Sequence, residues 1–136
     1  MAPTSPSATP AGPFADLVGF VFDSSPPSQS LSRLRIEEKH LNPHKVVHGA
    51  VLYAMADSGM GAALYPTLAA GELCATIEIK MTYFKAVAAG EIVCRTQLVN
   101  RGKRVAYLES SISSGEALLA KASGTYAIFQ PRASAA

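Results

Sequence analysis

One apolar segment between Gly49 and Pro66 constrains the fold of this chain more than any other feature. Every residue in it is apolar, small or hydroxyl-bearing except Asp57. A helix that is apolar on all sides is a buried helix. We therefore expect a central helix that begins near Gly49 and stops at Pro66, because the residue before a proline disfavours the α conformation.

The single acid of this helix is the first candidate for chemistry. Removing a carboxylate from water costs roughly 2–5 kcal/mol unless partners compensate. Two alternatives stay open: Asp57 lies on a surface edge, or it pairs with a base at a subunit contact. Gly59 and Gly61 each weaken a helix by about 1 kcal/mol relative to alanine. They are tolerable if a sheet, a second helix or a ligand approaches the helix backbone closely.

The start of the helix offers a second chemical group. Backbone N–H groups near Gly49 have no intrahelical acceptor and lie at the positive end of the helix dipole. Such groups polarise a carbonyl or hold a developing oxyanion. The preceding loop carries Asn42, His44 and His48. Asn42 also has an ordinary interpretation as a turn residue, and His48 has one as a helix-capping or loop-packing residue.

Metal chemistry is not expected from this loop. His40, His44 and His48 are spaced as on one face of a helix, but Pro43 disfavours a helix there. No cofactor is indicated by any other motif.

The rest of the chain has the pattern of an antiparallel sheet. Val18 to Phe22 and Leu31 to Glu37 are the first predicted strands, and four further alternations follow Gly71. The residues expected to share the faces of those four strands are Ile77, Ile79, Met81 and Tyr83; Ile92, Cys94, Thr96 and Leu98; Ala106, Leu108, Ser110 and Ile112; and Ala120, Ala122, Gly124, Tyr126 and Ile128. One helix and five to six antiparallel strands give an α+β domain whose sheet wraps around the helix.

Composition bounds the organisation of the chain. Residues 1–13 are rich in Pro, Ser, Thr and Ala, so we expect a disordered tail, followed by a single domain over 14–130 and a C-terminal tail over 131–136. The formal net charge of +2 gives no argument for nucleic acid. The sequence contains no uninterrupted bilayer-spanning run and no secretory signal pattern.

The two cysteines have no metal-binding spacing. We expect Cys74 and Cys94 to be reduced, buried strand residues of a cytoplasmic protein, with a cross-strand disulfide as the alternative.

The segment from His40 to Asp57, with the pattern H-x-N-x5-H-G-A-x6-D, resembles the signature of hotdog-fold acyl-CoA thioesterases of the phenylacetate-pathway (PaaI-like) type. Asn42, His48, Gly49 and Asp57 fall on the matching positions. The following T-I-E-I-K-M-T-Y-F-K-A-V is similar to the strand after the helix in that family. Two positions depart from the family pattern: Lys45 stands near a position that is often glycine, and Ala50 replaces the second glycine of H-G-G.

The resemblance implies a hotdog fold and an active site at a dimer interface, with dimers often pairing again. Unpaired sheet edges favour a homodimer independently. In the implied reaction, the Gly49 N–H polarises a thioester carbonyl and Asp57 of the partner subunit acts as general base or as nucleophile. Asn42 would hold the water or the carboxylate, and the Thr76 hydroxyl would help to position the water. His48 would orient the loop or contact the thioester. Thr76 is also an ordinary strand residue.

The implied substrate is an acyl-CoA with an aromatic or medium-chain acyl group. Arg101, Lys103 and Arg104 cluster around a predicted hairpin tip and would bind the CoA phosphates, although such a cluster is equally a solvated turn. Tyr83 and Met60 would line the acyl pocket, with ordinary core packing as the alternative. The competing function is a non-catalytic acyl-CoA binding or sensing module, which would gain nothing from desolvating Asp57.

Overall fold

The computed structural model describes residues 11–132, so the predictions for residues 1–10 and 133–136 lie outside the described residues. The elements in chain order are α1 (Pro13–Val18), β1 (Phe20–Asp23), β2 (Gln29–Arg35), the 3-10 helix η1 (Glu38–His40), α2 (Gly49–Leu64), the 3-10 helix η2 (Tyr65–Thr67), β3 (Leu73–Tyr83), β4 (Glu91–Arg101), β5 (Val105–Ser114) and β6 (Ala117–Phe129).

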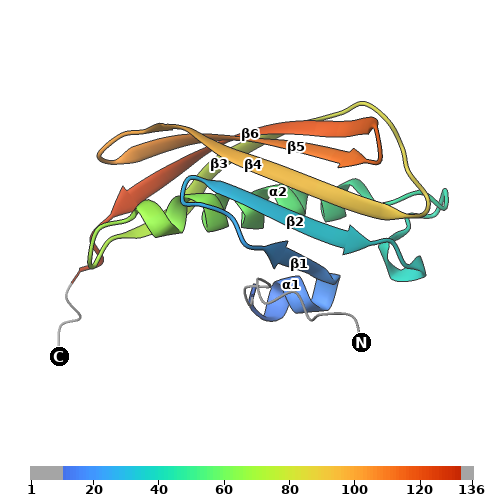
Figure 1. The fold of residues 1–136 in the computed structure, drawn as a ribbon, viewed down its shortest axis with the longest axis horizontal. Coiled ribbons are helices and arrows are strands. Elements are labelled where there is room, and N and C mark those ends of the chain that lie inside the picture. The colour runs from blue at the N-terminus through green and yellow to red at the C-terminus, as the bar shows by residue number, and fades with distance from the viewer. Residues whose placement is uncertain (1–10, 133–136) are drawn as a thin grey trace.

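The strands form one six-stranded antiparallel sheet with the order β1-β2-β4-β5-β6-β3. The long helix α2 lies along one face of this curved sheet (Figure 1). The core lies between the two, because α2 and the inward faces of the strands bury their apolar side chains against each other. The predicted α+β architecture, a sheet wrapped around one helix, is confirmed.

The predicted inward faces of β4, β5 and β6 agree with the burial of their residues. Alternate residues are buried from Ile92 to Thr96, from Ala106 to Ile112 and from Ala120 to Ile128, whereas Leu98 is only half-buried. The period-two pattern of these strands therefore predicted which side chains face the helix.

The first two strands begin and end at other residues than predicted. Val18 ends α1, Gly19 adopts a left-handed conformation with φ 104°, and β1 begins only at Phe20. Strand β2 spans Gln29–Arg35 instead of Leu31 to Glu37. The inward face of β2 begins with two serines, which apolar periodicity does not signal, and this explains the early start.

The predicted shared face of β3 is wrong at Ile77. A β-bulge between Thr76 and Glu78 inserts Ile77 as an extra residue, and the Ile77 side chain is 58% exposed. Ile79, Met81 and Tyr83 pair with inward-facing positions of β6, and Thr76 pairs with the inward-facing Tyr126. The bulge thus shifts the inward face by one residue.

Helix α2 ends at Leu64, close to the predicted stop at Pro66, but the predicted reason for the stop is wrong. Tyr65, the residue before Pro66, keeps a right-handed helical conformation, and the chain continues as the 3-10 helix η2. The prediction of burial on all sides is also wrong for the single chain. Met55 and Met60 are fully buried against the sheet, whereas Tyr53 is 39% exposed on the open side of the helix.

The two cysteines are free, as predicted, and they lie on the non-adjacent strands β3 and β4. Cys94 is buried, and this burial raises the pKa of its thiol to about 11. Cys74 is only half-buried, against the prediction, and desolvation raises its pKa as well.

The glycines of α2 provide a test of how closely the sheet approaches the helix. A Cβ at Gly59 would lie 2.8 Å from Thr96 Oγ1 and 3.2 Å from Ser30 Oγ, whereas a Cβ at Gly61 meets nothing within 4 Å. We expect Gly59→Ala to lower the free energy of unfolding by about 1–3 kcal/mol through overpacking. Gly61→Ala is the matched control and should leave it unchanged or raise it by up to about 1 kcal/mol. Urea unfolding measures the stability of both variants. Equal midpoints for the two would contradict a close approach of the sheet to Gly59.

Candidate active site

The carboxylate of Asp57 is half-buried on α2 and is held by two hydroxyl groups. Thr76 Oγ1 donates a hydrogen bond of 2.8 Å to Asp57 Oδ1, and the Tyr126 hydroxyl donates one of 2.5 Å to the same oxygen. Tyr126 also contacts the Asp57 carbonyl oxygen at 2.8 Å. Within residues 11–132, no Lys, Arg or His forms an ion pair with Asp57. Neutral donors therefore compensate the loss of hydration without cancelling the charge.

Tyr126 has no role in the sequence prediction beyond its place on the inward face of β6. Burial raises the pKa of its hydroxyl, and the hydrogen bond to Asp57 raises it further, so the hydroxyl remains protonated and donates. One signal was available in the sequence. A buried tyrosine needs a partner for its hydroxyl, and Asp57 is the only acid in the helix that the strand faces.

The start of α2 is capped by His48. Its Nδ1 accepts a hydrogen bond of 2.9 Å from the Ala50 N–H, which is the capping contact that the sequence left open. A neutral ring that accepts at Nδ1 carries its proton on Nε2, and the side chain is exposed. Gly49 is the first helical residue, so its N–H has no intrahelical acceptor.

Tyr83 packs directly against this helix start. Its hydroxyl donates a hydrogen bond of 2.8 Å to the Gly49 carbonyl oxygen, and a Cβ at Gly49 would lie only 3.0 Å from the tyrosine ring. A mostly apolar cavity of about 370 Å³ opens here, and it is lined by Val47, Gly49, Leu52, Tyr83, Phe84, Lys85, Ala86 and Val87. A carbonyl bound in this cavity would have access to the end of the helix.

The loop before the helix is held by Asn42. Its Oδ1 accepts hydrogen bonds from the backbone N–H of His44 at 2.9 Å and of Val46 at 3.4 Å, which is the turn role that was left open. Lys45 has φ 64°, a conformation that glycine adopts more readily than lysine. His44 is exposed. The loop geometry therefore explains why glycine suits a position near Lys45.

The structure brings no three metal-ligating side chains together within its described part. His40 is 3% exposed and both of its ring nitrogens are engaged: Nδ1 accepts from the Glu37 N–H at 2.9 Å, and Nε2 lies 2.5 Å from the Val18 carbonyl oxygen. His40 therefore supports the loop as a structural residue.

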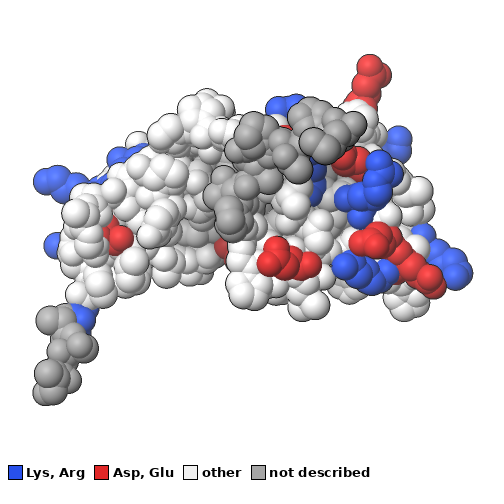
Figure 2. Space-filling view, turned by 60° about the horizontal axis from the view of Figure 1, so that its bottom comes forward, with Lys and Arg blue, Asp and Glu red and all other residues white. Residues whose placement is uncertain are grey.

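The predicted substrate-binding cations do not act as one cluster. Arg101 forms an ion pair of 3.0 Å with Glu72 and a hydrogen bond of 3.3 Å to the Thr67 carbonyl oxygen, so its guanidinium is already engaged. Lys103 and Arg104 are exposed. These contacts lie beyond the C-terminal end of α2, away from Gly49. Figure 2 shows charges of both signs interspersed at one end of the molecule and a largely uncharged middle.

Met60 belongs to the core. It is 0% exposed, and its sulfur packs so closely on Gly124 that a Cβ there would collide with it. The core-packing alternative is therefore the one that the structure favours for Met60. Tyr83, in contrast, borders a cavity.

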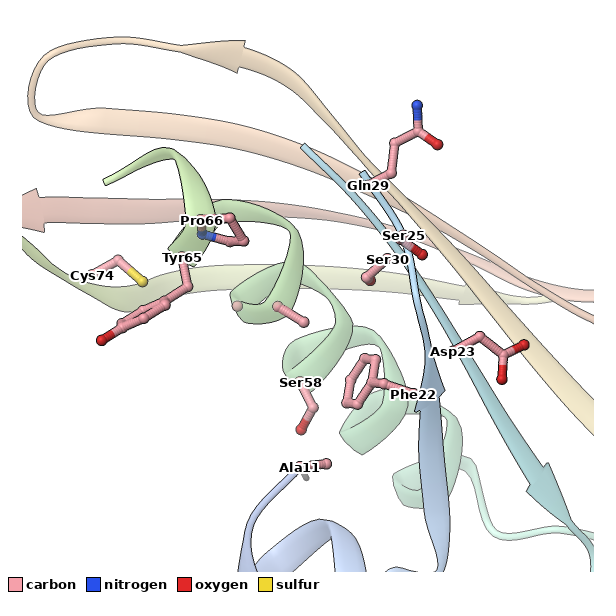
Figure 3. Close-up of a pocket in the computed structure, with 12 residues that line it drawn as sticks. Ala11, Phe22, Asp23, Ser25, Gln29, Ser30, Ser58, Tyr65, Pro66 and Cys74 are labelled. Atoms are coloured by element: carbon pink, nitrogen blue, oxygen red, sulfur yellow. The ribbon is translucent and has the colours of Figure 1, made fainter. Parts of the chain in front are cut away.

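A larger cavity of about 500 Å³ lies beside the second half of α2. Figure 3 shows Ser58, the neighbour of Asp57 in the chain, together with Phe22 and Tyr65 around it. Cys74 of β3 also borders it. Both cavities therefore adjoin the helix, one on each side of Asp57 along its length.

Gly49 and Asp57 of one chain lie far apart along the helix. They are eight residues apart in α2, which corresponds to about 12 Å along the helix axis. An oxyanion donor lies about 3 Å from the carbonyl oxygen, and a general base reaches the carbonyl carbon through at most one water molecule. The spacing therefore favours a site in which the two groups come from different copies of the chain.

Comparisons with known proteins identify the family. The model of the thioesterase superfamily matches residues 44–121, which include Gly49, Asp57 and Thr76. The chain is 30% identical over 118 residues to the "Putative esterase PA0474" of Pseudomonas aeruginosa, covering 85% of this chain and 88% of that protein. The chain therefore belongs to the thioesterase superfamily and is a thioester hydrolase.

Solved structures of similar proteins have the same fold. The conserved protein PA5202 from Pseudomonas aeruginosa superimposes with a TM-score of 0.80 at 28% identity, covering 87% of this chain and 94% of that one. A mutant of the phenylacetic acid degradation protein PaaI from Thermus thermophilus gives a TM-score of 0.80 at 26% identity, covering 85% of this chain and 98% of that one. The fold is the hotdog fold of PaaI-like thioesterases, as the motif predicted. Within residues 11–132, no helix has the length and apolar character to cross a membrane.

Proposed function

We propose that the thioester hydrolysed by this enzyme is an acyl-CoA with an aromatic or medium-chain acyl group, and that the products are the free acid and CoA. The observation that carries the proposal is the Asp57 carboxylate, half-buried, held by hydroxyl donors and without a cationic partner in the described chain. A structural acid in an apolar helix gains most from pairing with a base. The name of the similar PaaI protein, which refers to phenylacetic acid degradation, supports an aromatic acyl group.

The reaction begins with the thioester carbonyl at the start of α2. The Gly49 N–H donates to the carbonyl oxygen and stabilises the negative charge that develops on it. In one route, Asp57 takes a proton from a water molecule, the hydroxide adds to the carbonyl carbon, the C–S bond breaks and the proton passes to the CoA thiolate. In the other route, Asp57 itself adds to the carbonyl carbon, the C–S bond breaks and the CoA thiolate leaves. Water then hydrolyses the mixed anhydride to the free acid and the Asp57 carboxylate, and one of the protons that the water releases neutralises the thiolate. The same residues serve both routes.

Two copies of the chain build each site in this proposal. Gly49 and Asp57 of one chain are too far apart to share a carbonyl, so Asp57 of the partner subunit must supply the carboxylate. The outer edge of β3 is unpaired in the single chain, and edge pairing with a second copy would extend the sheet. The open side of α2, which carries the half-exposed Tyr53, would then face the partner. By the family resemblance, dimers pair again into tetramers.

The other site residues support these groups. Asn42 keeps the loop in the shape that presents Gly49, and His48 caps the helix while its Nε2–H remains able to reach a bound thioester. Thr76 holds the Asp57 carboxylate. Tyr83 forms one wall of the acyl site at the helix start. The two free cysteines suit the reducing cytoplasm that we propose as its location.

The exposed Lys103 and Arg104 are the cations that we propose for the CoA phosphates. Arg101 has a structural role instead, because its ion pair with Glu72 joins the β4–β5 hairpin to the segment after α2. Phosphate binding at an exposed pair of cations contributes modestly to affinity, so these residues tune substrate binding without affecting the chemical step.

The first prediction concerns catalysis. Release of free thiol from phenylacetyl-CoA, benzoyl-CoA and hexanoyl-CoA identifies the preferred ester, and Asp57→Asn should lower kcat for it by about 100- to 10,000-fold. The fold should persist, because asparagine still accepts from both hydroxyls. Asp16→Asn, which changes an exposed aspartate of α1, is the matched control and should retain full activity. Tight binding without hydrolysis of any ester by the unmodified protein would support the sensing module instead.

The second prediction concerns the nucleotide part of CoA, which carries the phosphates. The double variant Lys103→Ala/Arg104→Ala should raise KM for the acyl-CoA by about 5- to 30-fold, which corresponds to two exposed ion pairs of about 0.5–1 kcal/mol each. KM for the N-acetylcysteamine thioester of the same acyl group should not change, because that substrate has no phosphates. Arg95→Ala/Lys121→Ala on the outer face of the sheet is the control. Equal effects on both substrates would exclude a phosphate-binding role.

A further inference from the structure

The β-bulge of β3 has a specific effect on the Asp57 environment. Counting back by twos from the inward-facing Tyr83, Met81 and Ile79 reaches Ile77, so a regular strand would turn Thr76 away from the helix. The extra residue at the bulge reverses the alternation, and Thr76 faces inward directly opposite Tyr126 of β6. Bulges are known to redirect side chains beside active sites.

The cross-strand pair of hydroxyls binds only one oxygen of the carboxylate. Thr76 and Tyr126 both donate to Asp57 Oδ1, at 2.8 Å and 2.5 Å. No described residue donates a hydrogen bond to Oδ2. Tyr126 is 3% exposed, so its ring is fixed by the core, and its second contact to the Asp57 carbonyl oxygen fixes the hydroxyl relative to the helix backbone.

We propose that Tyr126 is a positioning residue which, together with Thr76, locks the Asp57 carboxylate so that Oδ2 is the oxygen that reacts. This inference rests on the proposed function. As a base, Oδ2 takes the proton of the attacking water and later returns it to the thiolate leaving group. As a nucleophile, Oδ2 forms the new bond to the carbonyl carbon while the C–S bond breaks. In both routes Oδ1 keeps its two donors throughout.

The charge state of the neighbours suits this role. Burial and the contact with Asp57 raise the pKa of Tyr126, so it keeps its proton over the working range of pH. Cys74, the titratable neighbour on the same face of β3, also has a raised pKa because of burial, and it stays neutral in acid. Tyr126 lies beyond residues 44–121, the range that the family model matches.

The test compares Tyr126→Phe and Thr76→Val with the unmodified enzyme on the panel of phenylacetyl-CoA, benzoyl-CoA and hexanoyl-CoA. Each variant should lower kcat by about 10- to 100-fold, the effect of a misplaced reactive group, while KM changes by less than about 3-fold. Tyr107→Phe, on the outward face of β5, is the matched control and should equal the unmodified enzyme.

The outcomes separate this inference from the proposed function. Hydrolysis of no ester by the unmodified enzyme overturns the proposed function and the positioning role together. Hydrolysis by the unmodified enzyme with kcat unchanged in Tyr126→Phe overturns the positioning role alone. Should Tyr126→Phe unfold at a lower temperature than the control, Thr76→Val decides, because Thr76 lies at the surface of the single chain and outside the core.

Discussion

The contact between the Asp57 carboxylate and two strand hydroxyls is the interaction on which the site depends. A helix that packs its apolar face on a sheet has little room for a charge, and an acid placed there needs partners. Thr76 and Tyr126 supply them without adding a positive charge, so the carboxylate keeps its capacity to accept a proton or to attack a carbon. The register between β3 and β6 places both hydroxyls beside Asp57. The sheet thereby determines the surroundings of the carboxylate on the helix.

Helix geometry adds a second constraint. The N-terminal N–H groups and the carboxylate lie at different heights of the same rigid helix, so in the proposed reaction one chain would present two half-sites that are too far apart to share a carbonyl. Association of two copies in an antiparallel sense would bring the start of one helix to the acid of the other. The unpaired edge of β3 and the open side of α2 offer the surfaces for such an association.

The sequence predicted the elements with a clear local signal and missed those that depend on long-range register. The start of α2 near Gly49 and the position of its single acid followed from the apolar segment alone. The bulge at Ile77 was hidden, because the alternation from Ile77 to Tyr83 is perfect in the sequence although the strand follows it only from Ile79 onward. The partnership of Tyr126 with Asp57 joins residues 69 positions apart, and the ion pair of Arg101 joins residues 29 apart. No local sequence pattern indicates contacts between residues that are so far apart in the chain.

Complementation between two inactive variants tests the shared site most directly. Gly49→Pro removes the N–H at a first helical position, where the proline backbone fits, and the Tyr83 ring beside it must move to make room for the new side chain. Because Tyr83 of that chain borders only the site that Gly49→Pro inactivates, the other site is not affected. Asp57→Asn removes the reactive oxygen. Unfolded together in urea and refolded as a mixture, the two variants should form mixed dimers in which one of the two sites is intact. The account predicts recovery of up to roughly a quarter of the unmodified activity. A mixture no more active than the two variants refolded separately would contradict a site built from two copies.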